Sequence, residues 1–156
     1  MMRFLFLGVF ALGGCATVSS TNYATPFCEQ LSVFADSVPS HESRTVRLMR
    51  GGDWPVDFYK ACRREDEPAS IAFCDWLVEH TSTEFMEANI NVALSCLQGH
   101  RIAGHIGNTG IESWSGKATF LNPNIASENV EVTVEYSVDY SVNDHEDYLD
   151  ITVVAD

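Results

Sequence analysis

The stretch that decides the fold is residues 130–142, Val-Glu-Val-Thr-Val-Glu-Tyr-Ser-Val-Asp-Tyr-Ser-Val. Apolar and polar residues alternate over its whole length. Successive side chains of a β-strand point to opposite faces, so valines and tyrosines would line one face and acidic and hydroxyl residues the other. Such alternation is typical of an antiparallel sheet with one buried side and one solvent-facing side. We therefore expect a strand that covers a core and exposes acidic groups.

Further strands are expected on both sides of this stretch. Glu112 to Leu121 forms one and is stopped by Asn122-Pro123-Asn124, and Tyr148 to Ala155 forms the last. Three successive strands with short connections predict an antiparallel β-meander. Arg44 to Arg50 is an additional candidate strand, followed by the turn signal Gly51-Gly52-Asp53.

The alternation also predicts how the last two strands pair. The apolar residues of the final strand must join the valine face, because a shift of one residue would move them to the opposite face. A four-residue turn at Asn143 to Glu146 achieves this and sets Val138 opposite Ile151. The same register places Asp139 opposite Asp150 on the solvent-facing side.

The first two thirds of the chain show helical spacing instead. Four helices are predicted, at residues 25–38, 54–63, 68–80 and 81–98. Thr25 is the expected N-cap of the first. The last begins with a capping box of Thr81 and Glu84, and Phe85 and Cys96 belong to its buried stripe. The prediction is an α+β fold in which disulfide-linked helices pack on a C-terminal antiparallel meander, within a single domain of residues 25–156.

Residues 1–15 have the features of a targeting signal. Arg3 precedes an apolar run that ends at Leu12-Gly13-Gly14-Cys15, which is the layout of a secretory signal. An ordinary signal peptide would favour Ala-x-Ala, and a spanning helix would need about 20 residues. The tetrapeptide resembles the lipobox of bacterial lipoproteins, in which signal peptidase II cuts before a cysteine that carries a diacylglycerol. This resemblance implies a signal peptide of residues 1–14, lipidation of Cys15, a tether to residue 24 and, with Ala16 next, an outer-membrane anchor facing the periplasm.

Lipidation of Cys15 leaves four cysteines, Cys28, Cys62, Cys74 and Cys96. An even number in an exported chain predicts two disulfides, because the periplasm is oxidising. Three pairings are open. We favour Cys62–Cys74, which closes a short polar loop, together with Cys28–Cys96, which joins the start of one helix to the end of another.

Charge narrows the possible partners. Without residues 1–14 the chain keeps 8 basic and 22 acidic residues, a net charge of −14. This charge repels nucleic acids and anionic lipid headgroups and attracts basic proteins. The acidic side of the predicted sheet is the candidate partner-binding surface, with the alternative that it is an ordinary solvated face. Its residues are Glu131, Glu135, Asp139 and Asp150, with Asp156 beside them.

The segments Cys74-Asp75-Trp76-Leu77-Val78-Glu79-His80 and Ala93-Leu94-Ser95-Cys96 resemble the small disulfide-bonded periplasmic immunity proteins that protect bacteria from type VI secretion toxins. The sequence carries no motif of a hydrolase, metalloprotease or phosphate-binding loop. Asp144 to Asp147 lacks the oxygen-ligand spacing and the glycine of an EF-hand loop. Cys96 with His100 and His105 is not expected to bind zinc, because Cys96 is expected in a disulfide and no fourth ligand lies nearby. We expect a lipid-anchored binding protein without catalytic activity or cofactor, such as an immunity protein or inhibitor. The alternative is a structural or assembly lipoprotein of an envelope complex.

Overall fold

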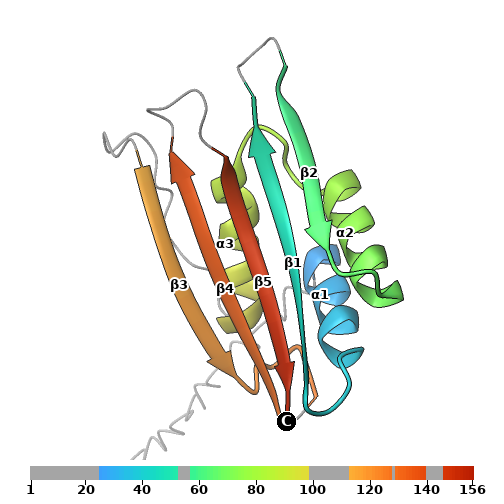
Figure 1. The fold of residues 1–156 in the computed structure, drawn as a ribbon. Coiled ribbons are helices and arrows are strands. Elements are labelled where there is room, and N and C mark those ends of the chain that lie inside the picture. Colours follow the sequence, from blue (N-terminus) through green and yellow to red (C-terminus); the bar gives the residue numbers. More distant parts are fainter. Residues whose placement is uncertain (1–24, 53–56, 99–112, 128, 140–145) are drawn as a thin grey trace, which may run out of the picture.

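The computed structural model describes residues 25–52, 57–98, 113–127, 129–139 and 146–156. Its five strands form one antiparallel sheet in the order β2-β1-β5-β4-β3, and the three helices lie against one face of it (Figure 1). The α+β fold is therefore confirmed. The elements are α1 (Pro26–Asp36), β1 (Glu42–Gly51), β2 (Tyr59–Arg64), α2 (Pro68–His80), α3 (Met86–Gln98), β3 (Ser113–Leu121), β4 (Val130–Asp139) and β5 (Asp147–Ala155).

The expected meander is present as β3, β4 and β5, but the sheet extends beyond it. β1 pairs with β5, so the C-terminal strand occupies the centre of the sheet. A helix was expected at residues 54–63, but residues 59–63 belong to β2, so the prediction was wrong there; residues 54–56 lie outside the described residues. The residues of β2 alternate poorly between apolar and polar, and the pairing of β2 with β1 outweighs the weak local preference.

The register of β4 and β5 differs from the predicted one by four residues. Val134, not Val138, lies opposite Ile151, and Asp150 faces Glu135 rather than Asp139. A shift of an even number of residues keeps every side chain on its predicted face, which is why the alternation alone did not reveal the error. Residues 143–145 of the predicted turn lie outside the described residues.

The junction between α2 and α3 also differs from the prediction. Thr81 ends α2, because its backbone N–H and its hydroxyl both donate to the carbonyl oxygen of Leu77. Asn89 then holds the turn by accepting from the N–H of Ser82 and donating to its carbonyl oxygen. The capping box is absent, and Phe85 is 55% exposed rather than buried, because α3 begins after it.

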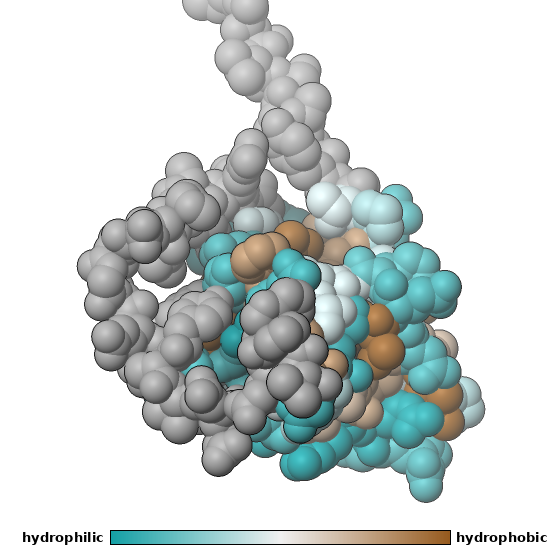
Figure 2. All heavy atoms as spheres, turned by 90° about the horizontal axis from the view of Figure 1, so that it is seen from above, coloured by the Kyte–Doolittle hydropathy of each residue, from teal (hydrophilic) through white to brown (hydrophobic). Residues whose placement is uncertain are grey.

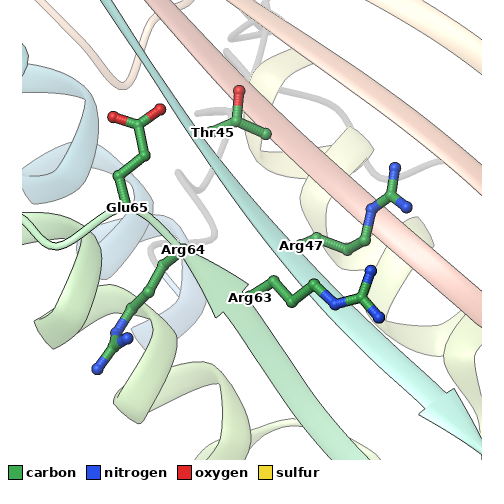
Figure 3. A pocket seen from close by; sticks show the side chains of 5 residues that line it. All are labelled: Thr45, Arg47, Arg63, Arg64 and Glu65. Atoms are coloured by element: carbon green, nitrogen blue, oxygen red, sulfur yellow. The ribbon is translucent and has the colours of Figure 1, made fainter.

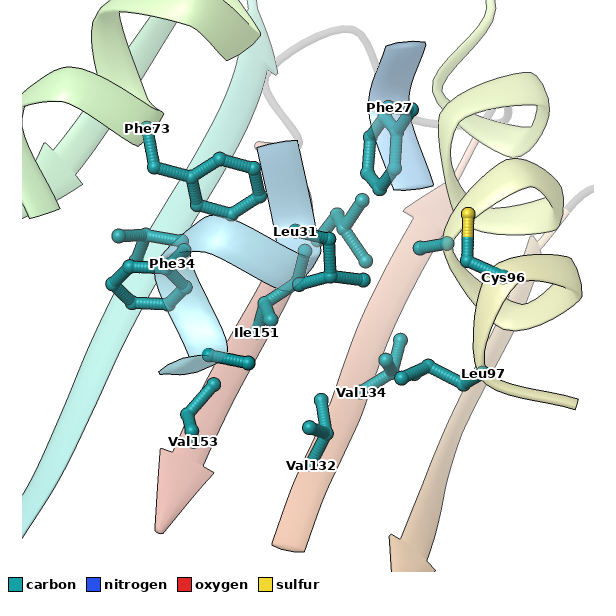
Figure 4. Close-up of a cluster of buried hydrophobic side chains, with 14 of the residues drawn as sticks. Phe27, Leu31, Phe34, Phe73, Cys96, Leu97, Val132, Val134, Ile151 and Val153 are labelled. Carbon is teal, nitrogen blue, oxygen red and sulfur yellow. The ribbon is translucent and has the colours of Figure 1, made fainter. Parts of the chain in front are cut away.

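The core lies between the helices and the sheet face that they cover. Aromatic and aliphatic side chains from α1, α2 and α3 meet the valine face of β4 and β5 (Figure 4). Cys28 of α1 is bonded to Cys96 of α3, and Cys62 of β2 to Cys74 of α2, which confirms the favoured pairing. One bridge therefore joins two helices, and the other fixes the edge strand β2 to the helix layer. Among the described residues, no helix is long and apolar enough to cross a membrane.

Candidate functional site

We call the side of the sheet that faces the helices the inner face and the opposite side the outer face. No helix of the described chain covers the outer face (Figure 1). Residues that oppose one another in antiparallel strands share a face, so the register assigns the outer side chains. They are Tyr59, Ala61 and Arg63 of β2; Ser43, Thr45, Arg47 and Met49 of β1; Tyr148, Asp150, Thr152 and Val154 of β5; Glu131, Thr133, Glu135, Ser137 and Asp139 of β4; and Ser115, Lys117, Thr119 and Leu121 of β3.

A line of charges crosses the outer face from one edge of the sheet to the other. Each of its members lies directly opposite the next across neighbouring strands. We call them the charged row: Arg63, Arg47, Asp150, Glu135 and Lys117. A parallel line of threonines lies beside it, Thr45, Thr152, Thr133 and Thr119, with hydroxyl contacts of 2.9 Å at each end.

Within the charged row, Arg47 contacts both an acidic and an aromatic side chain. Its Nε lies 2.6 Å from Oδ1 of Asp150 and its Nη2 lies 2.5 Å from Oδ2, which makes a two-pronged ion pair. Its guanidinium also lies 4.5 Å from the centre of the Tyr148 ring. The hydrogen bonds to Asp150 raise the pKa of Arg47. Asp150 therefore binds the guanidinium of Arg47 through two nitrogen atoms, and the guanidinium lies over the ring of Tyr148.

The four predicted partner-binding residues lie on the outer face, but their environments differ. Asp150 is bonded to Arg47, and Glu135 lies 3.3 Å from the ammonium of Lys117. Glu131 has no ion-pair partner in the part of the chain that the structure describes. The backbone N–H of Asp139 donates to the buried carboxylate of Asp147. The face is therefore one of mixed charge and not the purely acidic one that the sequence suggested.

Asp156 lies apart from the other predicted acidic residues. It follows the last residue of β5, is exposed, and donates its backbone N–H to the carbonyl oxygen of Asn129. This contact belongs to the end of the sheet and places no carboxylate in the charged row.

Sequence reasoning missed the basic members of the face. Arg47 lies between Val46 and Leu48 in the sequence, so the alternation of polar and apolar residues was enough to predict that its side chain points outward. Its pairing with Asp150 could not be predicted in this way, because that pairing joins positions 103 residues apart in the sequence. The wrong helix prediction for residues 54–63 likewise hid the outward position of Arg63.

A second polar cluster lies on the inner side, where β1 ends and β5 begins. Arg50 pairs with Asp147, which is 1% exposed, and its guanidinium also donates to the carbonyl oxygen of Glu84. Lys60 donates to the carbonyl oxygen of Thr81 over 2.6 Å, and burial lowers the pKa of its ammonium. Both cations hold the α2–α3 junction onto the sheet, so we assign this cluster a structural role.

Large apolar side chains do not gather into one docking patch among the described residues. Seen from the end where β1 stops, hydrophilic residues dominate the surface and hydrophobic ones occur in small separate areas (Figure 2). The exposed large apolar residues come from different elements: Val33, Tyr59, Val78, Phe85 and Leu121. Recognition at this surface would therefore depend on polar and charged groups.

Comparison of the chain with family models, with curated proteins and with solved structures finds no match. Among the described residues, no three or more His, Cys, Asp or Glu side chains are grouped to hold a metal ion. His100 and His105, which were considered as ligands, lie outside those residues. The outer face is therefore the candidate functional site.

Proposed function

We propose that this chain is a lipid-anchored protein that faces the periplasm from the outer membrane and binds a protein partner through the outer face of its sheet. The observation that carries the proposal is the charged row, in which Arg47 and Asp150 form a two-pronged ion pair while Arg63 stays exposed. Elsewhere on the outer face, Glu131 has no ion-pair partner among the described residues. Fixed charges on a broad sheet face recognise a complementary charge pattern more readily than an apolar ligand. The binding is non-catalytic, and occlusion of a toxic partner, as by an immunity protein or inhibitor, is its most specific form.

The anchor and the disulfides support the proposed location. The Leu12-Gly13-Gly14-Cys15 motif resembles a lipobox, and two disulfides suit a compartment that keeps thiols oxidised. Replacement of Cys15 by Ser would remove the acceptor of the lipid. We expect this variant to leave the membrane fraction, whereas a membrane-bound Cys15→Ser protein would contradict the lipid anchor.

Partner binding is tested with the full chain, isolated from envelope membranes in a neutral detergent. A charge-neutralised outer face, Glu131→Gln with Glu135→Gln, is compared with Asp75→Asn and Glu79→Gln on exposed positions of α2. Both pairs remove two negative charges, so long-range attraction changes equally. A partner that is lost only with the outer-face pair supports the proposal.

Other outcomes of that experiment have distinct meanings. A partner that is retained by both variants, or lost equally with both, contradicts binding at the outer face. Recovery of a stable assembly of several envelope proteins instead of one dominant partner would favour the structural or assembly role. That role predicts a fixed stoichiometry within the assembly, whereas an inhibitor forms a one-to-one complex.

A further inference from the structure

The basic residues of this acidic chain are concentrated in one hairpin. Between Arg44 and Arg64 the sequence holds six of its nine Lys and Arg residues and only two acidic ones, Asp53 and Asp57. This segment includes most of β1 and all of β2, at one edge of the sheet. A local positive region on a molecule of opposite net charge calls for a specific explanation.

A shallow open hollow of about 270 Å³ lies at this edge, lined by Thr45, Arg47, Arg63, Arg64 and Glu65. Figure 3 shows Arg47 and Arg63 extending side by side in the same direction from β1 and β2, whereas Arg64 points the other way. The first two arginines are direct cross-strand partners on the outer face. Their β-carbons in such a pair are about 5 Å apart, so the two guanidinium groups can reach a single small ligand.

The two arginines play unequal parts. Asp150 and Tyr148 hold Arg47 in place, yet the two-pronged ion pair uses only two of its five N–H groups, leaving others on the side away from Asp150. Arg63 is 67% exposed, and its only contact with a carboxylate in the described chain is 3.8 Å from Glu146. That distance is too long for a hydrogen bond.

Two like charges at a cross-strand pair destabilise a sheet unless an opposite charge lies between them. The anchored Arg47 and the exposed Arg63 supply both a fixed and an adjustable guanidinium, which is the arrangement that binds an oxyanion on two sides. We propose that Arg47 and Arg63 form a binding site for a small oxyanion group, a carboxylate or a phosphate. This site uses two members of the charged row, at one edge of the proposed partner-binding face, but an anion can bind there without a docked protein.

The site is tested by NMR on the full chain with isotope-labelled arginine, following the side-chain Nε–Hε signals. Sodium acetate and sodium phosphate are titrated separately against sodium chloride at constant ionic strength, so that general screening does not change. We expect saturable shifts of the Arg47 and Arg63 signals, and the anion with the lower dissociation constant identifies a carboxylate or a phosphate as the better ligand.

Two basic residues of the outer face provide matched variants. Arg63→Ala should weaken anion binding at Arg47 at least about fivefold, because a charge-assisted hydrogen-bonding group is lost. Lys117→Ala removes the same charge from the opposite edge of the outer face, away from the hollow, and should change the affinity less than about twofold. Equal effects of the two variants, or shifts that do not saturate for either anion, would overturn the proposal.

Discussion

The inner and outer faces of this sheet come from the same strands and differ in almost every physical respect. On β5, Ile151 is fully buried in the core, while its neighbour Asp150 turns outward to bind Arg47. Inner-face residues gain stability from apolar burial, which depends little on the identity of the neighbour. Outer-face residues depend on which charge lies opposite, and therefore on register. We therefore expect the inner face to supply most of the stability of the molecule, and we propose the outer face as the surface that recognises a partner.

The largest expected effect comes from breaking the inner face. Ile151→Ala should lower the free energy of unfolding by roughly 4 kcal/mol, because it leaves a cavity at a fully buried position. Thr152→Ala, the next residue on the outer face, removes one hydroxyl contact with Thr45 and should cost about 1 kcal/mol or less. Urea unfolding of the two variants measures the contrast. Equal losses would contradict the assignment of the faces.

The Cys62–Cys74 bridge tests how the edge strand is held on its inner side. Replacing both cysteines by Ala should lower the free energy of unfolding by roughly 3 kcal/mol, because a loop with a separation of 12 residues is no longer closed in the unfolded chain. The matched control is Ala61→Ser on the outer face of the same strand, for which we expect a change within about 0.5 kcal/mol. Thermal unfolding under oxidising conditions compares them. A bridge whose removal is neutral would show that β2 is held by β1 alone.

A smaller effect is expected for the two ion pairs of the outer face, Arg47 with Asp150 and Lys117 with Glu135. A double-mutant cycle of Arg47→Ala and Asp150→Ala should give a coupling energy of about 1 kcal/mol, because the pair is two-pronged and Asp150 is 13% exposed. The same cycle for Lys117 and Glu135, which are 62% and 44% exposed, should give less than about 0.5 kcal/mol. Equal coupling energies for the two pairs would contradict this description of the outer face.

The smallest effect concerns acid stability where the helix layer meets β1. Arg44 donates a hydrogen bond to Glu67 and lowers the pKa of that carboxyl below its ordinary value of 4.5. A carboxyl with a lowered folded-state pKa stabilises the protein above its unfolded value and loses that contribution as the pH falls through the folded one. Glu67→Gln should therefore flatten the decline in stability below about pH 4.5. The free energy of unfolding is measured by urea unfolding across pH. If its decline below about pH 4.5 is the same in Glu67→Gln, the ion pair of Arg44 with Glu67 does not contribute to stability.

The local sequence pattern was sufficient to predict the meander and the faces of its strands. It left three disulfide pairings open, of which the favoured one is confirmed. The valines at positions 130, 132, 134 and 138 are all buried, as their alternation predicted. The β4–β5 register was wrong because alternation fixes the face but not a shift by an even number of residues. β2 was missed because a short charged edge strand has no periodic signal and forms only against β1.

The candidate site was predictable in part for the same reason. The four acidic residues are on the predicted face, since that follows from parity within a strand. Their basic partners Arg47 and Lys117 come from other strands, and Arg47 joins the row through the long-range pairing of β1 with β5. The sequence therefore indicated an acidic surface where the folded chain has a mixed one.

The central claim, that a protein partner binds the outer face, is tested most directly by hydroxyl-radical footprinting of the complex recovered from the envelope. Tyr59 and Leu121, at the two edges of the outer face, are 45% and 72% exposed, whereas Val33 and Val78 on the helices are 65% and 38% exposed. We predict that oxidation of Tyr59 and Leu121 falls in the complex while oxidation of Val33 and Val78 stays unchanged. Protection of the helix residues with no change at Tyr59 and Leu121 would contradict the claim.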